Sequence, residues 1–332
     1  MAIEFQVLGK PQCDNALLVR IKTGQSIHRL LFDCGEGCLD DLDFSEVREI
    51  DHLFFSHLHM DHVAGFDRYF RCNYDRPGGT NSFWGPVGTH EILQHRFLGY
   101  LWNLHDGMKG RCLVHTIAPE RVLCHRYELQ ETYSIAHLQP TNASIDLLID
   151  EPSYQVRPLF LNHGTSSIGY VVQEKPRNNI DIERLESLNL KPGPWLKHLR
   201  GGGDPNTDLG PEAGGMRLGE LAEKVIVTTP GESIAYLTDF IVDDQEIDNL
   251  AKKLQGCRHL ICESQYLSED RELAVKNHHL TAIESAKIAA RAQVDELTLI
   301  HISTRYSESQ WRGALQEAKA IFPKARFATH WQ

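Results

Sequence analysis

The chain has 332 residues, of which 41% are hydrophobic, and a formal net charge of −11. This length suits one large domain or two modest ones, and the apolar content supports a buried core and excludes a disordered chain. No apolar run approaches the roughly 18 residues that a membrane span requires, and the N-terminus lacks the features of a signal peptide. We therefore expect a cytoplasmic protein without a membrane partner. The acidic balance argues against non-specific nucleic-acid binding but allows a local basic patch.

Eight cysteines favour reduced thiols over a disulfide framework, because no Cys-x-x-Cys pair is present. Cys34 and Cys38 flank a glycine-containing turn. They could share a metal ion, but two ordinary thiols are the favoured interpretation.

Short apolar segments predict strands in both halves of the chain. In the first half we expect strands over 3–8, 16–21, 30–32, 52–56 and 82–84, a helix over 89–104, and strands over 145–149, 156–161 and 168–173. In the second half we expect strands over 224–228, 233–238, 259–262 and 296–300, and helices over 243–254, 281–291 and 309–321. Strands that lead each half, with helices laid over them, predict an α/β fold: an αββα four-layer sandwich in a single domain, residues 1–332.

One segment, about 174–215, is polar, rich in glycine and proline, and without strand periodicity. A short helix over 181–188 is the only regular element expected in it. A stretch of this kind inside a compact domain is commonly functional or disordered, so we interpret it as an inserted, flexible, protruding arm. Lys and Arg outnumber Asp and Glu between Glu174 and Arg200, which favours phosphate contact. An ordinary solvated loop is the alternative.

A cluster of histidines directly after the apolar strand Leu53-Phe54-Phe55 gives the strongest signal. It contains three imidazoles and one carboxylate within six positions: His57, His59, Asp61 and His62. These are ligand types that bind zinc and similar divalent metals. Alternation places His57 and His59 on one side of an extended loop, able to hold one ion, while Asp61 and His62 turn toward a second. Metal binding explains this cluster far better than core packing.

Three further residues of ligand type also follow apolar strands. His163 comes after Leu159-Phe160-Leu161, Asp239 after the strand that ends near Leu237, and His301 after Leu297–Ile300. Chemistry in αβ sandwiches collects at such strand ends. Each residue alone would more often be an ordinary hydrogen-bonded side chain, but together with the cluster they indicate a two-metal site.

This set of residues resembles the ligand set of the metallo-β-lactamase superfamily. The resemblance implies two zinc ions, with manganese or another divalent metal as the alternative. One ion would be held by His57, His59 and His163, the other by Asp61, His62 and His301, with Asp239 bridging them. Asp33 matches the acid that orients a ligand from behind in that superfamily.

Further strings are similar to the ribonuclease Z family, over about residues 31–306. Leu190–Trp195, with Gly193 and Pro194, resembles the flexible arm that clamps the tRNA elbow in that family. His279-Leu280-Thr281 resembles its His-Ser-Thr loop, and His301–Tyr306 resembles its last motif. Three departures are visible. The bridging acid stands in Leu237-Thr238-Asp239-Phe240 in place of Gly-Asp-Thr. The loop 8–13 lacks the usual Gly-Thr-rich pattern, and Cys262-Glu263-Ser264-Gln265 replaces His-Glu-Ala-Thr, although the Glu is kept.

The resemblance implies a zinc-dependent phosphodiesterase and endoribonuclease that removes 3′ trailers from precursor tRNA by metal-activated hydroxide attack. Asp61 would accept a proton besides binding metal, and His279, steadied by Glu263, would protonate the leaving oxygen. Arg305 would contact a substrate phosphate, and the Gly193-Pro194 part of the arm would bind substrate. The resemblance also implies a homodimer.

Two other hypotheses stay open. The first is a small-molecule hydrolase that acts on cyclic phosphodiesters, lactones or thioesters with the same dinuclear zinc site. The second is a non-catalytic scaffold that has kept the fold. A scaffold would be expected to have lost ligands, whereas all seven ligand positions are filled.

Overall fold

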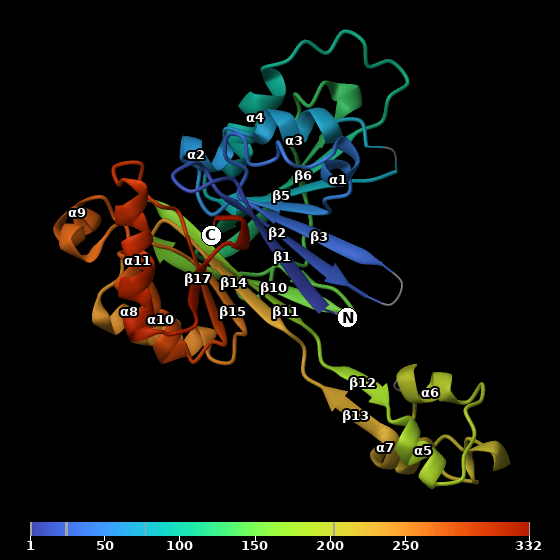
Figure 1. The fold of residues 1–332 in the computed structure, drawn as a ribbon. Helices are drawn as coiled ribbons and strands as arrows, with labels where there is room; N and C mark the ends of the chain where they lie inside the picture. The colour runs from blue at the N-terminus through green and yellow to red at the C-terminus, as the bar shows by residue number, and fades with distance from the viewer. Residues whose placement is uncertain (1, 24–25, 77, 202, 332) are drawn as a thin grey trace. The chain divides into compact units, whose positions relative to one another are not determined.

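Two β-sheets with helices on their outer faces form the larger of two units in the computed structural model, which describes residues 2–23, 26–76, 78–201 and 203–331 (Figure 1). This unit comprises residues 1–173 and 232–332, and the second unit comprises Glu174–Gly231. The fold class predicted from the sequence, an αββα sandwich, is confirmed for the larger unit. Within the described residues, no helix is both long and apolar enough to cross a membrane.

The first sheet has eight strands in sequence order. Their bounds are β1 Ala2–Leu8, β2 Ala16–Lys22, β3 Ile27–Phe32, β4 His52–Phe54, β5 Asn81–Pro86, β6 Arg111–Ala118, β7 Arg121–Glu128 and β8 His137–Gln139. The central strands β3 to β6 are parallel, and antiparallel pairs flank them. The loops that follow β3 and β4 therefore emerge at the same edge of the sheet.

The second sheet has seven strands in the order β17-β16-β15-β14-β11-β10-β9. Their bounds are β9 Ile149–Asp150, β10 Tyr154–Asn162, β11 Ser166–Glu174, β14 Ser233–Leu237, β15 His259–Glu263, β16 Glu296–Ile300 and β17 Ala325–Phe327. Strands β14 to β17 are parallel, so β14, β15 and β16 deliver their following loops to one edge.

Helices cover the outer face of each sheet (Figure 1). The first sheet carries α1 Phe44–Arg48, α3 Phe66–Asn73 and α4 Thr89–Leu98, and the short helix α2 Met60–Val63 follows β4. The second sheet carries α8 Asp244–Leu254, α10 Ala282–Ala292 and α11 Glu308–Ile321, with α9 Arg271–Lys276 beside them. Capping boxes begin α8, α10 and α11, at Asp243, Thr281 and Ser307.

The two sheets share an apolar core. Phe32 and Phe54 of the first sheet belong to one buried cluster with Tyr170 and Tyr236 of the second, and the rings of Phe32 and Tyr170 lie 5.4 Å apart. The Tyr170 hydroxyl donates a 2.7 Å hydrogen bond to the carbonyl of Phe55. This hydrogen bond joins β11 of the second sheet to the residue that follows β4 of the first sheet, just before the histidine cluster. It therefore holds together the two sheet edges that carry the site.

Several predicted elements of the larger unit differ from the structure. The helix predicted over 89–104 ends at Leu98, because Gly99 caps it and the chain turns away. The sequence prediction omitted the paired strands β6 and β7; only the first half of each alternates buried and less buried positions. The strand predicted over 224–228 was also misplaced: residues up to Val225 are helical, and Ile226–Thr229 forms β13, outside both large sheets.

The second unit has its own regular structure and core. It contains β12 Arg177–Ile180 paired with β13 Ile226–Thr229, and the helices α5 Ile182–Ser187, α6 Leu196–Gly201 and α7 Leu218–Val225. Apolar side chains, including Leu185, Trp195 and Leu221, pack together inside it. The expectation of one helix as the only regular element was therefore wrong. Its apolar residues are spread over several short elements, and none is long enough to show a period by itself.

Candidate metal centre

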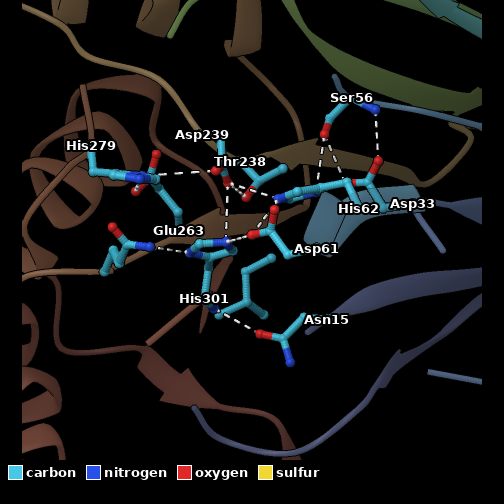
Figure 2. A network of polar contacts seen from close by, with 12 residues as sticks. Asn15, Asp33, Ser56, Asp61, His62, Thr238, Asp239, Glu263, His279 and His301 are labelled. Carbon is cyan, nitrogen blue, oxygen red and sulfur yellow. Dashed lines mark hydrogen bonds and ion pairs between the residues drawn. The ribbon is translucent and has the colours of Figure 1, made fainter. Parts of the chain in front are cut away.

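The ligand-type residues lie just beyond strand ends, as the sequence places them. His57 follows β4, and His59 is the residue that begins α2, so Asp61 and His62 lie on that helix. His163 follows β10, Asp239 follows β14 and His301 follows β16. Both sheets thus contribute to one cluster, part of which is drawn in Figure 2.

Backbone conformation at the cluster is unusual. Asp33, Asp239 and His301 have φ values of 60°, 53° and 56°, in the left-handed region that non-glycine residues seldom adopt. Such conformations cost about 1–3 kcal/mol each and persist where the surroundings hold them in place, commonly at functional sites. Each of the three residues directly follows a strand or lies within two residues of its end; Asp239 and His301 belong to a group of possible metal ligands, whereas Asp33 contacts one of them, His62.

Asp239 occupies the middle of the cluster and is almost fully buried. Its Oδ1 lies 3.5 Å from Nε2 of His62 and 3.3 Å from Nε2 of His301. Its Oδ2 lies 3.7 Å from Nε2 of both His57 and His163. The two oxygens of one carboxylate therefore face two different sets of imidazoles.

The possible metal ligands fall into two main groups among the described residues. In each group the ligand atoms all lie within 4.8 Å of one another; the groups are His57, His59 and His163, and Asp61, His62, Asp239 and His301. Asp61 belongs to the second group through its Oδ2, which is 3.4 Å from Nε2 of His62 and 3.5 Å from Nε2 of His301. A third set joins His163 and Asp239 to His279.

Asp33 supports His62 from the side away from this space. Its Oδ2 lies 2.7 Å from Nδ1 of His62, which leaves Nε2 of that ring facing the other ligands. Asp33 is fully buried and also accepts hydrogen bonds from the backbone N–H and hydroxyl of Ser56 and from the hydroxyl of Tyr236. Four donors around one carboxylate hold the His62 ring in a single orientation; Figure 2 shows Asp33 beside two of the residues that supply them, Ser56 and His62.

Two other histidines are also fixed through Nδ1. Nδ1 of His163 lies 2.8 Å from the carbonyl oxygen of His278, and Nδ1 of His301 lies 3.2 Å from the side-chain amide of Gln265. His278 therefore acts through its backbone, at a φ of 59°. Neither contact could be found from the sequence, because a carbonyl carries no residue signature and Gln265 has no spacing relation to His301.

Glu263 connects the loops after β14 and β15. Its Oε2 lies 3.0 Å from Nδ1 of His279 and accepts the backbone N–H of Leu280, and its Oε1 accepts the N–H of Phe240. The carboxylate is fully buried. His279 itself lies 4.0 Å from Oδ2 of Asp239, measured at Nδ1, so it borders the metal-ligand cluster.

The pKa values describe the charge that this cluster favours. Burial alone would raise the pKa of Asp239, but His301 and His62 hold it well below its ordinary value. Burial likewise opposes a charge on His301, yet Asp239 and Asp61 raise its pKa to about 9. By contrast, burial and the neighbouring His62 lower the pKa of His57 to about 2. The carboxylates thus stabilise positive charge in the space between them, as a cation site requires.

The residues present fit a divalent metal. Nε2 of His57 and Nε2 of His62 are buried and have no hydrogen-bond partner among the described residues. Buried polar atoms are normally hydrogen-bonded, and an unpaired imidazole nitrogen that faces carboxylates is a typical metal-ligand atom. The cluster therefore indicates divalent metal binding.

Cys34 and Cys38 do not resemble metal ligands. Both side chains are buried in the apolar cluster between the first sheet and its helices. Burial, with a smaller effect of Cys38, raises the pKa of Cys34 well above its ordinary value, and burial raises that of Cys38 to about 12. Since a thiol binds metal as thiolate, these values agree with two ordinary thiols.

The candidate substrate-binding residues lie in two places. Arg305 is exposed near the metal cluster, where its guanidinium carbon lies 4.8 Å from the centre of the Tyr266 ring and its Nε donates to Oγ of Ser303. Gly193 and Pro194 belong to the second unit, just before α6.

Comparison with known proteins identifies relatives along the whole chain. The ribonuclease Z of Deinococcus radiodurans is 44% identical over 327 residues, which are 98% of this chain and 97% of that protein. The ribonuclease Z of Prochlorococcus marinus is 29% identical over 322 residues, 95% of this chain and 91% of that protein. A family model described as anti-Pycsar protein Apyc1 matches residues 10–154.

Solved structures show the same fold. Human tRNase Z, short form, matches with a TM-score of 0.56 at 18% identity and covers 99% of this chain and 96% of its own. The metallo-β-lactamase fold protein YhfI from Bacillus subtilis matches with a TM-score of 0.56 at 16% identity, covering 98% and 96%.

Two sheets flanked by helices, with histidines and aspartates converging from both, define a metal-dependent hydrolase of the metallo-β-lactamase fold. Because its identity to the Deinococcus radiodurans protein reaches 44% across almost the full length of both, the chain belongs to the ribonuclease Z family.

Proposed function

We propose that this protein is an endoribonuclease that removes 3′ trailers from precursor tRNA with the help of two zinc ions. The observation that carries the proposal is the buried cluster of two ligand groups around Asp239, in a chain 44% identical to a ribonuclease Z over 98% of its length. Imidazole and carboxylate ligands favour zinc, although manganese accepts the same donors.

In this proposal one zinc ion is held by His57, His59 and His163, the other by Asp61, His62 and His301, with Asp239 between them. The two groups of ligand atoms and the two-sided contacts of Asp239 support this division. When bound, paired divalent ions supply a water-derived nucleophile near neutral pH and neutralise charge on the phosphate. The residues of the chain orient these ligands, exchange protons and bind the substrate.

His279 is proposed as the group that protonates the leaving oxygen. The Glu263 carboxylate, 3.0 Å from Nδ1, holds the imidazole in one orientation, as a positioned proton donor requires. Asp61 is proposed to accept a proton, because its carboxylate is half-exposed and borders the same cluster. The proposed acceptor, Asp61, lies beside His62 and His301, and the proposed donor, His279, lies 4.0 Å from Oδ2 of Asp239.

Substrate binding is assigned to Arg305 and to the second unit. Arg305 rests on the Tyr266 ring and is tied to Ser303 through Nε, so its terminal N–H groups are oriented for a phosphate. The second unit, with Gly193 and Pro194, is proposed as an inserted arm that contacts the tRNA. Its own apolar core gives it the rigidity that such a contact needs.

We also propose a homodimer that acts in the cytoplasm. The dimer is supported by the resemblance to ribonuclease Z, and a reducing compartment by eight free cysteines, most of them buried.

A comparison of substrates tests the proposal. The zinc-loaded protein would be given, in parallel, a precursor tRNA with a 3′ trailer, a cyclic mononucleotide and a chromogenic phosphodiester. The proposal predicts the highest kcat/KM for the precursor tRNA. Preference for a cyclic or other small phosphodiester, with no cleavage of the tRNA, would place the protein among small-molecule hydrolases that use the same metal ligands.

A further inference from the structure

The loop Gly9–Asn15, between β1 and β2, lies against the metal centre and departs in sequence from the ribonuclease Z pattern. It contains no proposed metal ligand. Its contacts nevertheless reach loops of both sheets, and the most direct of them is made by Asn15.

Asn15 is bonded directly to the segment that carries His301. Its side chain is 2% exposed, and its Oδ1 accepts the backbone N–H of His301 at 2.9 Å (Figure 2). Its Nδ2 donates to the carbonyl oxygens of Lys10 and Asp14, at 3.1 and 3.0 Å. Both the oxygen and the nitrogen of the Asn15 amide are therefore hydrogen-bonded, so Oδ1 is held in place as the acceptor for the His301 N–H.

The acceptor matters because of the conformation of His301. With a φ of 56°, this residue leaves β16 in the left-handed region, which is unfavourable for a residue with a Cβ atom. Its N–H is turned out of the strand ladder and is bonded to Asn15 instead. Loss of the acceptor would remove the contact that holds this turn and would allow the imidazole to leave its place beside Asp61 and Asp239.

The same loop also contacts the part of the site that the first sheet contributes. Oδ2 of Asp14 accepts the backbone N–H of Glu36 at 2.7 Å. Gly35 is enclosed there, since a Cβ atom on it would lie 2.3 Å from Cβ of Asp14 and 2.2 Å from the carbonyl oxygen of Asp61. The loop is thus packed against the backbone that carries Asp61 while Asn15 holds His301.

A third contact fixes the loop on the residues that follow His301. Nε2 of Gln12 donates to the carbonyl oxygens of Ser303 and Tyr306, at 3.1 and 2.5 Å. Among the described residues, no hydrogen bond joins the loop to His57, His59 or His163. The loop therefore supports one ligand group, that of Asp61, His62, Asp239 and His301, and not the other.

We propose that Asn15 is a positioning residue for His301, and that it sets the metal affinity of the Asp61, His62, Asp239 and His301 group alone. The inference rests on the proposed two-metal function. In this proposal the loop Gly9–Asn15, which contains no ligand, keeps Asp61 of the first sheet and His301 of the second at the correct separation.

Titration of the metal-free protein with Zn²⁺ against a competing chelator tests this proposal without any RNA substrate. The wild type is expected to bind two equivalents. Asn15→Ala is expected to bind one equivalent as tightly as the wild type and the other about 10–100-fold more weakly, the usual effect of removing a group that orients a ligand. Asn15→Asp keeps an oxygen acceptor for the His301 N–H and is expected to restore much of the lost affinity.

Asn73→Ala is the matched control. Asn73 is equally buried and its amide also donates to two carbonyl oxygens, those of Val47 and Tyr69, but it lies in α3, away from the site. If Asn15 were merely structural, both alanine variants would lose stability and keep both metal affinities. That result would overturn the proposal. So would an equal loss of Zn²⁺ affinity at both equivalents in Asn15→Ala, or no recovery of affinity in Asn15→Asp. Failure to cleave tRNA would leave this titration unaffected.

Discussion

Nδ1 of His279 lies 3.0 Å from Oε2 of Glu263, a carboxylate that is completely buried and also binds two backbone N–H groups. A carboxylate held in this way cannot follow the imidazole if the ring moves, so the ring is oriented by the protein. The pair therefore has the geometry of a proton donor and its support, beside a cluster of metal ligands.

Replacing His279 with Ala should lower kcat on precursor tRNA by about 10²–10⁴-fold, the usual contribution of a positioned acid or base. The zinc content, measured by elemental analysis, should stay at the wild-type value, because the proposed ligands are untouched. Glu263→Gln should lower kcat less, since glutamine keeps a polar side chain beside the His279 ring but removes the negative charge. Loss of zinc from His279→Ala would show that this residue is a ligand and not the donor.

Asp33→Asn should weaken binding of one zinc equivalent by about 10–100-fold. The substitution keeps the volume but removes the negative charge that faces Nδ1 of His62. Asp51→Asn is a suitable control, since Asp51 also accepts a backbone N–H, that of Arg29, but lies away from the site. Equal zinc affinities in the two variants would contradict the assigned role of Asp33.

Removal of the second unit should separate RNA cleavage from the chemistry. Residues 180–226 can be replaced by a two-residue Asn-Gly turn, because Asn179 of β12 and Val227 of β13 lie opposite each other in the antiparallel pair. Cleavage of precursor tRNA should fall by about tenfold or more as phosphate contacts are lost, while turnover of a chromogenic phosphodiester should persist. A parallel loss of both activities would show that the unit is needed for the metal site itself.

Arg305→Lys should raise KM for precursor tRNA with little change in zinc content. Lysine keeps the charge but loses the planar group that stacks on Tyr266 and the Nε bond to Ser303. Arg305→Ala, which also removes the charge, should in addition reduce the salt dependence of kcat/KM, because one phosphate is no longer neutralised. Unchanged KM and salt dependence would remove Arg305 from the substrate-binding residues.

Acid should destabilise the fold through His115. Its ring stacks on Trp84 with centroids 3.6 Å apart, and burial, with a smaller effect of His52, lowers its pKa to about 3. An unfolded histidine takes up a proton near pH 6.5, whereas the folded one does not, so stability falls as pH drops from about 6.5 toward 3. The loss is at most about 1.4 kcal/mol per pH unit for one histidine.

Urea unfolding at pH 7 and pH 5 measures this effect. His115→Phe keeps an aromatic ring against Trp84 and cannot titrate, so its stability should differ less between the two pH values than that of the wild type. The same difference in both proteins would show that His115 takes up its proton in the folded state as readily as in the unfolded state.

Much of the fold and of the candidate site follows from local sequence. The strands before His57, His163, Asp239 and His301 are short apolar runs. In the parallel part of the second sheet, β14 and β16 deliver Asp239 and His301 to one edge. The site residues could be selected from the sequence because residues of metal-ligand type stand directly after these apolar strands. The helices α8, α10 and α11 have apolar residues at three-to-four spacing, from which their starts were predicted within one residue.

Other features depend on tertiary contacts and leave no local pattern. The bond from Asn15 to His301 spans 286 positions, and the one from His163 ends on a carbonyl of His278. Apart from α5, which the sequence predicts over 181–188, the elements of the second unit were missed because its core is shared among short elements. Strands β6 and β7, by contrast, were visible in principle: two eight-residue runs surround Pro119-Glu120, where a hairpin turn is expected.

The most direct test of the account is cleavage of an end-labelled precursor tRNA that carries a 3′ trailer, with and without a chelator, with products mapped to the nucleotide. We predict one cut beside the discriminator base that disappears with chelator and returns with added Zn²⁺. Asp239→Ala should abolish it, because that carboxylate faces both ligand groups. A cut that survives the chelator, or no cut by a protein that holds two equivalents of zinc, would contradict the proposed function.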